Sequence, residues 1–177
     1  MYRYSTQMKL EEAKKNFVEA WGTLGTNWGI NRTMAQIHAL LMVTEQPLST
    51  DEIMAILDAS RGNVNMNMRT LIDWGLAERK TKLGERMEFF VGEKDIWRVA
   101  VKIIRERRKR EIDPLRSTLR DLKMIDDRED KPEEYQRFMK LLTDIDGFAD
   151  SADKITDKMM LADQNWFFGT MMKMMLK

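Results

Sequence analysis

The sequence contains no cysteine and a single histidine, His38, among its 177 residues. The missing thiols exclude disulfides, thiol catalysis and thiolate metal ligands, and they are typical of a reducing cytoplasm. One histidine is too few for a histidine-based metal site or a catalytic triad. The N-terminal stretch "MYRYSTQMKLEEAKK" has no apolar signal core, and no window approaches the run of about 18 apolar residues that a membrane span needs. We therefore expect a soluble, cytoplasmic protein with no membrane partner.

The sequence motifs of enzymes are missing as well. It has no glycine-rich phosphate loop with Walker or Rossmann spacing. The paired carboxylates Asp126 and Asp127 fall in a charged segment without an apolar pocket to raise a pKa. The sixteen methionines are more typical of gap-filling core than of a soft-metal site. We expect no enzyme activity, no cofactor and no metal.

Net charge is also low, at +1, although a third of the residues (33%) are charged. Any affinity for nucleic acid must therefore come from a local concentration of charge. Between Ser60 and Arg86, six basic residues face three acidic ones, a local excess of +3. This excess directs attention to the segment "SRGNVNMNMRTLIDWGLAERKTKLGERMEFFV".

Helical periodicity and caps organise the chain before that segment. Apolar residues three and four positions apart predict a first helix from Leu10 to Leu24, and the three glycines of "GTLGTNWGIN" predict its end. Asn31 is a suitable N-cap for a second helix, which ends before Gln46 and Pro47. The length of 177 residues fits one domain or one domain with an appendage.

A helix, a tight turn, another helix and a hairpin follow. Ser49 and Glu52 form a capping-box signature for the third helix, Ser60 caps the fourth, and Gly75 suits a left-handed C-terminal cap. The strands "LAERK" and "RMEFFV" are joined by "TKLGE", whose Gly84 suits a hairpin loop. In the second strand Met87, Phe89 and Val91 share one face, and Arg86, Glu88 and Phe90 share the other. Three helices followed by a two-stranded hairpin is the order of a winged helix-turn-helix.

Long helices occupy the remainder of the chain, with an interruption or kink expected at Pro114. The basic run from Arg105 to Arg116 alternates with acids and is more typical of a solvated helix face than of a DNA contact. The last helix carries an apolar heptad stripe that must pack on other helices. A second subunit is the simplest way to supply those helices. The stripe consists of Phe138, Leu141, Ile145, Phe148, Ala152, Ile155, Met159, Ala162 and Trp166.

The helix from Ser60 to Trp74 is the candidate reading element. At 100° per residue, Val64, Met68 and Leu71 share one side, Asn67 lies nearer to that side, and the polar residues lie opposite. Asparagine pairs with adenine and arginine with guanine, while wing cations suit backbone phosphates. The alternative without a function is that the asparagines cap an ordinary surface helix and face the solvent. The predicted DNA-binding residues are Ser60, Arg61, Gly62, Asn63, Asn65, Met66, Arg69, Lys80, Lys82 and Arg86.

These same segments resemble the GbsR branch of the MarR-like winged-helix transcriptional regulators. The resemblance rests on "FVEAWGTLGTNWGINRTMAQIHALLM", "LSTDEIMAILDASRGNVNMNMRTLIDWGLAERK" and "GERMEFF", and it covers roughly residues 17–91. It implies a dimeric DNA-binding repressor or activator, and we expect a repressor. From Glu93 onward only the layout is similar, a helical region that pairs two subunits in such proteins.

The expected fold class is mainly α with a small β-hairpin, a winged helix-turn-helix plus a helical dimerisation region. We expect an N-terminal helix contributing to dimerisation (1–25), the DNA-binding domain (26–92) and the helical dimerisation region (93–177). The partners would be double-stranded DNA and a second copy of the chain. The runner-up is a winged-helix protein–protein adaptor without a DNA role.

A small-molecule effector is a further hypothesis. Indole faces attract quaternary ammonium compounds by cation–π contact, and Trp28 and Trp97 are the candidates for such a site. The alternative, favoured for most of the aromatic residues, is that they fill the core or the dimer interface. Trp28, in a glycine-bounded turn, is the residue to follow.

Overall fold

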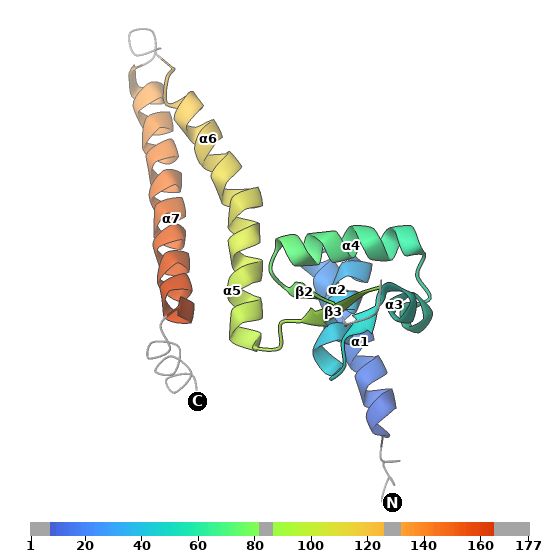
Figure 1. Ribbon diagram of the computed structural model, residues 1–177. Coiled ribbons are helices and arrows are strands. Elements are labelled where there is room, and N and C mark those ends of the chain that lie inside the picture. The colour runs from blue at the N-terminus through green and yellow to red at the C-terminus, as the bar shows by residue number, and fades with distance from the viewer. Residues whose placement is uncertain (1–7, 82–86, 126–131, 165–177) are drawn as a thin grey trace, which may run out of the picture. The chain divides into compact units, whose positions relative to one another are not determined.

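The computed structural model describes residues 8–81, 87–125 and 132–164. The chain divides into two compact units, of which one ends at Ile96 and the other begins at Trp97 (Figure 1). None of the helices in the described ranges is long and apolar enough to cross a membrane.

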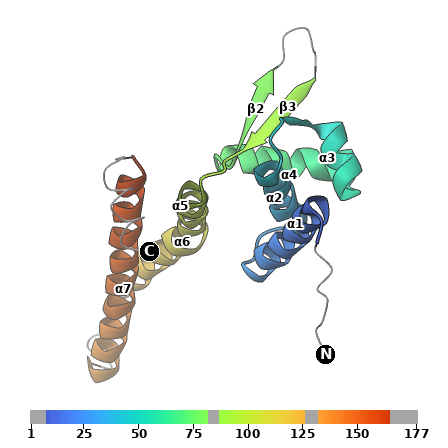
Figure 2. The same cartoon turned by 90° about the horizontal axis from the view of Figure 1, so that it is seen from below.

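The first unit has the element order of a winged helix, which confirms the predicted fold class. Its three strands form one antiparallel sheet in the order β1-β3-β2. In Figure 2 the strands β2 and β3 extend away from the helices as a hairpin. The elements are α1 (Leu10–Asn27), α2 (Arg32–Val43), β1 (Leu48–Ser49), α3 (Thr50–Leu57), α4 (Arg61–Asp73), β2 (Ala77–Thr81) and β3 (Glu88–Gly92).

The helix ends of this unit are set by the predicted local signals. Asn31 Oδ1 accepts a hydrogen bond from the Met34 amide at 3.1 Å, so it caps α2. Ser49 and Glu52 form the complete capping box at the start of α3. Gly75 adopts a left-handed conformation, with φ of 70°, just beyond α4. Because each signal acts within a few residues, all of these predictions are confirmed.

The first helix ends within the glycine segment, as predicted, but it ends at Asn27, three residues beyond Leu24. α1 continues through Gly22 and Gly25, both buried, to Asn27. A Cβ on Gly22 would lie 2.6 Å from Gln36 Cγ, and one on Gly25 would lie 2.5 Å from Ala35 Cβ. These glycines therefore allow α1 and α2 to pack closely. That packing outweighs their helix-propensity cost of about 1 kcal/mol each.

An aliphatic core joins α2, α3 and α4. Ile37, Leu41, Ile53, Val64 and Leu71 are each at most 2% exposed. Full burial of such a side chain stabilises the fold by about 1.5–3 kcal/mol. The core therefore fixes the rotation of α4 about its own axis, and with it the face that α4 turns to solvent.

The sheet contains one strand that the sequence did not reveal. β1 has only two residues and pairs with β3 in the register Leu48 to Phe90 and Ser49 to Phe89. Phe89 and Phe90 are both buried, at 4% and 3% exposure, although they point to opposite faces of β3. A two-residue strand carries no readable periodicity, so only tertiary structure shows it.

In the second unit a π-helical turn precedes Pro114, which confirms the predicted interruption. Pro114 has no N–H, and its ring clashes with the carbonyl four residues earlier, so regular α-helical bonding cannot continue there. The Asp113 N–H bonds instead to the Arg108 carbonyl oxygen, five residues back. The elements are α5 (Ile96–Arg107), the π turn η1 (Arg108–Ile112), α6 (Asp113–Leu122) and α7 (Pro132–Gln164).

α7 packs beside α6 through a face other than the predicted heptad stripe. Leu142, Ala149 and Asp153 are its buried residues in the described part, at 3%, 1% and 6% exposure. Two members of the stripe are strongly exposed instead, Phe148 at 76% and Ile155 at 61%. Ile145 and Ala152 of the stripe are half-buried, and Trp166, its last member, lies outside the described residues.

Candidate nucleic-acid interface

α4 is anchored by its inner face and by its N-terminal cap. Val64, Met68 and Leu71 are each at most 2% exposed. The Ser60 side chain accepts a hydrogen bond from the Asn63 amide at 3.3 Å, which satisfies one of the free N–H groups of the first turn. A helix held in this way presents a fixed outer face.

The outer face of α4 brings together most of the residues predicted from the sequence to bind DNA. Met66 is 59% exposed. Arg61 and Arg69 are exposed, and Asn65 is half-buried. Gly62 is exposed, and a Cβ placed there would meet nothing within 4 Å. The face therefore offers two cations, one amide and an unobstructed stretch of main chain within the first three turns, and helix-turn-helix proteins place base contacts near the start of this helix.

The three asparagines have different environments. Asn67 is 3% exposed, as its predicted position near the buried side implies. Its Nδ2 donates to Asn63 Oδ1 at 2.6 Å and to the Asn63 carbonyl oxygen at 2.9 Å. Asn63 Nδ2 in turn donates to Thr33 Oγ1 on α2 at 3.3 Å. Asn65 is thus the asparagine whose side chain is least engaged within α4 and α2.

Arg61 forms an ion pair with Asp51, across the turn between α3 and α4. Both side chains remain more than half exposed, at 59% and 57%. Sequence reasoning missed Asp51 and Thr33 as partners of the predicted reading residues. Asp51 and Arg61 are ten positions apart on different helices, and no periodic or capping signal joins such positions.

The cations of the hairpin are paired in its described part. Lys80 Nζ lies 2.9 Å from Glu78 Oε2 on the same strand. Arg79 lies 3.1 Å from Glu88 across the β2–β3 pair. These are exposed ion pairs, which are worth at most about 1 kcal/mol and exchange readily for a phosphate. Lys82 and Arg86, the other predicted wing contacts, lie outside the described residues.

The aromatic residues considered for a cation site fall in different units. Trp28 is 51% exposed in the first unit, whereas Trp97 belongs to the second. His38 is 2% exposed and its ring centroid lies 6.3 Å from that of Trp21, in keeping with a structural role. In the described ranges no group of three or more acidic, histidine or cysteine residues is placed to hold a metal ion.

No protein-family model matches the sequence. No curated protein matches it either. Solved structures do match it. A crystal structure of a transcriptional regulator has 22% identity and a TM-score of 0.61, and the match covers 86% of this chain and 99% of that one. At this identity the likeness shows the fold alone.

Two further solved structures resemble the chain more distantly. An S. aureus MepR mutant bound to an oligodeoxyribonucleotide is 14% identical with a TM-score of 0.38, over 77% of this chain and 92% of that one. A MarR protein from Peptoclostridium difficile is 13% identical with a TM-score of 0.37, over 88% and 97%.

Proposed function

We propose that this chain is a sequence-specific DNA-binding transcriptional regulator of the GbsR branch of MarR-like proteins, acting as a repressor. One observation carries the proposal: α4 is capped and anchored by its buried face, while its outer face exposes Arg61, Met66 and Arg69 and carries the half-buried Asn65 beside them. A helix of this construction fits the major groove, where arginine and asparagine read base edges. The hairpin would supply phosphate contacts through Lys80, Lys82 and Arg86.

We also propose that the regulator is a cytoplasmic homodimer. The stripe on α7 supports this, because Leu141, Phe148 and Ile155 are seven residues apart and 53%, 76% and 61% exposed. An apolar heptad stripe of this kind is typical of a helix that packs on another helix. Residues 1–25 and 93–177 would contribute to the dimer. Its two-fold symmetry would then require a palindromic site with half-sites about 10 base pairs apart.

The test is fluorescence anisotropy with DNA from upstream of the protein's own gene, titrated over salt with excess nonspecific competitor. Arg61→Ala and Asn65→Ala should each weaken binding about fivefold or more, since a good base contact contributes about 1–3 kcal/mol of discrimination. Arg137→Ala, which removes an equal charge from an exposed site on α7, is the matched control.

Three results would oppose the proposal in different ways. Binding that vanishes with salt and ignores Asn65→Ala would leave only an electrostatic contact. Equal losses from Arg137→Ala and Arg61→Ala would remove the special role of α4. No binding to any genomic DNA would favour the protein–protein adaptor.

A further inference from the structure

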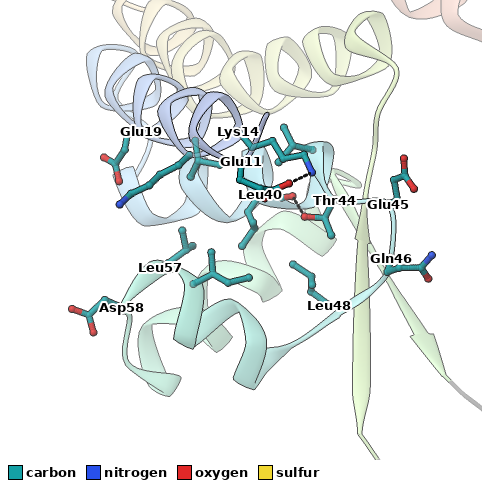
Figure 3. Close-up of a pocket in the computed structure, with 14 residues that line it drawn as sticks. Glu11, Lys14, Glu19, Leu40, Thr44, Glu45, Gln46, Leu48, Leu57 and Asp58 are labelled. Carbon is teal, nitrogen blue, oxygen red and sulfur yellow. Dashed lines mark hydrogen bonds and ion pairs between the residues drawn. The ribbon is translucent and has the colours of Figure 1, made fainter. Parts of the chain in front are cut away.

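A pocket of about 740 Å³ lies in the first unit, between α1, the end of α2 and α3 (Figure 3). Its size is within the range of about 300–1,000 Å³ that small-molecule sites occupy. In Figure 3 Leu40, Leu48 and Leu57 converge on its centre from three different elements. Its apolar lining consists of Val18, Leu40, Val43, Leu48, Ile56 and Leu57.

The lining is aliphatic and partly wetted. Leu40 and Val18 are only 6% exposed each, so the floor of the pocket is part of the unit's core and is already formed. Ile56 is 56% exposed at the wall, and Val43 and Leu57 are half-buried. Among the described residues, no aromatic side chain lines the pocket. A ligand here would therefore gain affinity from burying a flexible aliphatic chain, and not from stacking or from a cation–π cage.

The charged residues around this floor favour a cation. Two lysines and four carboxylates line the pocket, which leaves a net charge of −2. Lys14 is paired with Glu11 at 2.9 Å, and Glu19 with Arg32 at 2.7 Å. Glu45 and Asp58 form no ion pair among the described residues, and Lys15 forms none either. The unpaired groups of the lining are thus two anions and one cation.

The edge formed by Thr44, Glu45 and Gln46 is rich in hydrogen-bond acceptors. It offers a carboxylate, an amide oxygen and main-chain carbonyls at the mouth of the pocket. Lys94, which does not line the pocket, donates from its ammonium group to the Thr44 carbonyl oxygen at 2.7 Å, so this carbonyl is already engaged and the Glu45 carboxylate is the main acceptor left at the edge. Figure 3 places Glu45 and Asp58 at opposite ends of the pocket, with both side chains directed away from its centre.

We propose that this pocket binds a primary aliphatic ammonium compound, with its alkyl chain on the aliphatic floor and its N–H donors on the Glu45 edge. A primary ammonium carries three donors that match the acceptors of this edge. A trimethylammonium head has none, and the lining residues that the structure describes offer no aromatic face in exchange. A carboxylate head would meet the like charges of Glu45 and Asp58.

The position of the pocket gives such a ligand a route to the reading helix, and this step rests on the proposed function. Leu48 directly precedes Ser49, the N-cap of α3, and Asp58 is the C-cap of α3 in a left-handed conformation with φ of 49°. A bound ligand would therefore contact both ends of α3, the helix whose turn leads into α4. The ligand can shift DNA affinity only if it binds the two states unequally.

The first experiment uses the full chain without DNA. Octylammonium, octanol, octanoate and octyltrimethylammonium are titrated by two-dimensional amide NMR and by calorimetry. Octylammonium should bind saturably and about fivefold or more tighter than each of the other three. Only this compound can both bury its alkyl chain on the aliphatic floor and donate hydrogen bonds to the Glu45 edge. Tighter binding of octanoate or of octyltrimethylammonium would overturn the proposal. No saturable binding of octylammonium would overturn it as well.

Two pairs of variants assign binding to this pocket. Ile56→Gln, at an exposed wall position, should weaken octylammonium about fivefold, whereas Leu10→Gln, at an exposed position of α1 outside the pocket, should not. Glu45→Gln should weaken octylammonium but not octanol, and Glu12→Gln, an exposed acid outside the pocket, is its control. Binding indifferent to both Ile56→Gln and Glu45→Gln would overturn the site.

A DNA arm separates this proposal from the proposed function. Saturating octylammonium should change the DNA affinity of the unaltered chain about threefold or more. It should not change the DNA affinity of Ile56→Gln, because the ligand acts on DNA binding only when it occupies the pocket. Ligand binding without any change in DNA affinity would overturn the regulatory step. Failure of DNA binding itself would oppose the proposed function and leave the ligand titration as a separate result.

Discussion

Asn67 is tied to Asn63, one turn earlier in α4, by two hydrogen bonds from the same amide nitrogen. Asn67 Nδ2 lies 2.6 Å from Asn63 Oδ1 and 2.9 Å from the Asn63 carbonyl oxygen. Because Asn63 also donates to Thr33, this pair joins α4 to α2 through polar contacts beside the apolar core. A buried, hydrogen-bonded asparagine of this kind is structural, whereas Asn65 on the same helix is half-buried and takes no part in this pair.

The two asparagines should therefore respond in opposite ways to substitution. Asn67→Ala should lower the free energy of unfolding by about 1–2 kcal/mol, because it leaves acceptors of Asn63 unsatisfied in a half-buried site. Asn65→Ala should change stability by less than about 0.5 kcal/mol, yet weaken operator binding. Urea unfolding and DNA anisotropy on both variants measure this. Loss of operator selectivity from Asn67→Ala alone, with Asn65→Ala silent, would reverse the assignment.

Asp51 should restrain Arg61 and thereby limit nonspecific binding. Asp51→Asn frees the Arg61 guanidinium and removes a negative charge near the N-terminus of α4. Affinity for nonspecific duplex DNA should therefore rise about three- to tenfold. The ratio of specific to nonspecific affinity should fall. The pair is exposed, so stability should change by less than about 1 kcal/mol.

The control for Asp51→Asn is Glu12→Gln, which removes one negative charge from an exposed position of α1. Anisotropy with operator and scrambled duplexes at several salt concentrations compares the two variants. An equal rise from both would show only a change in overall charge. A fall in nonspecific affinity from Asp51→Asn would show that the ion pair holds Arg61 in its binding position.

Glycine-to-alanine substitutions should distinguish a glycine that allows two helices to pack, Gly25, from one that allows the main chain to approach DNA, Gly62. Gly25→Ala should lower the free energy of unfolding by about 1–2 kcal/mol, because its Cβ would lie 2.5 Å from Ala35 Cβ. Gly62→Ala meets nothing within 4 Å and should stabilise α4 by about 0.4–1 kcal/mol. If the main chain at Gly62 approaches a phosphate, the same variant should weaken DNA binding. A stabilised Gly62→Ala with unchanged DNA affinity would remove Gly62 from the interface.

Local signals account for what the sequence predicted well. The capping box of Ser49 and Glu52, the Asn31 cap and the left-handed Gly75 each act within a few residues, so their outcome depends little on the rest of the fold. The outer face of α4 followed from the 100° period once three apolar residues fixed the inner face. The predicted fold class was confirmed on these grounds.

Predictions failed where a residue's role is set by a distant neighbour. Gly22 and Gly25 belong to the glycine segment that predicts the end of the first helix. The close approach of α2 instead makes both of them packing residues inside α1. The pairing of Asp51 with Arg61 depends on the angle between α3 and α4, which no spacing encodes. On α7, Asp150 and Asp153 pair with Arg116 of α6, whereas Phe148 and Ile155 of the heptad stripe are exposed, and the spacing of the apolar residues encodes neither outcome.

Acid should weaken the second unit. Hydrogen bonding to Lys123 lowers the pKa of Asp146 below its ordinary value, and hydrogen bonding to Lys154 and Arg116 does so for Asp150. A carboxyl group with a lowered folded pKa stabilises the fold above its unfolded pKa, and this stability is lost as the pH falls through the folded value.

The loss should therefore begin near pH 4 and grow below it, since unfolded aspartates titrate at about 3.9. Circular dichroism melts between pH 6 and 3 measure the effect. Asp146→Asn should flatten part of the pH dependence, whereas Asp121→Asn, at an exposed residue without an ion pair in the described chain, should not. Equal pH profiles for Asp146→Asn and the unaltered chain would contradict this account.

Asp153 is the central anion between α6 and α7, and its removal should destabilise the second unit more than removal of any exposed carboxylate there. Its side chain is 9% exposed, with Oδ2 at 2.5 Å from Arg116 and Oδ1 at 3.1 Å from Arg108. Asp153→Ala should cost about 2–3 kcal/mol, below the range for a fully buried pair, because the arginines are 28–29% exposed and keep other acidic partners. Asp144→Ala, at a pair 62–76% exposed on α7, should cost less than about 0.5 kcal/mol.

A double substitution decides whether Asp153 acts by attraction or by preventing a buried, unpaired charge. Asp153→Leu with Arg116→Met replaces the closest pair by apolar groups, and such replacements are often neutral or stabilising. If the double variant recovers most of the loss seen in Asp153→Ala, the cost lies in the uncompensated arginine. If it remains as unstable as Asp153→Ala, the ion pair itself holds α7 against α6. Urea unfolding monitored by circular dichroism gives the free energies of unfolding of the unaltered chain, Asp153→Ala and the double variant. A loss below about 0.5 kcal/mol from Asp153→Ala would show that the apolar contacts of Leu119, Leu142 and Ala149 suffice without it.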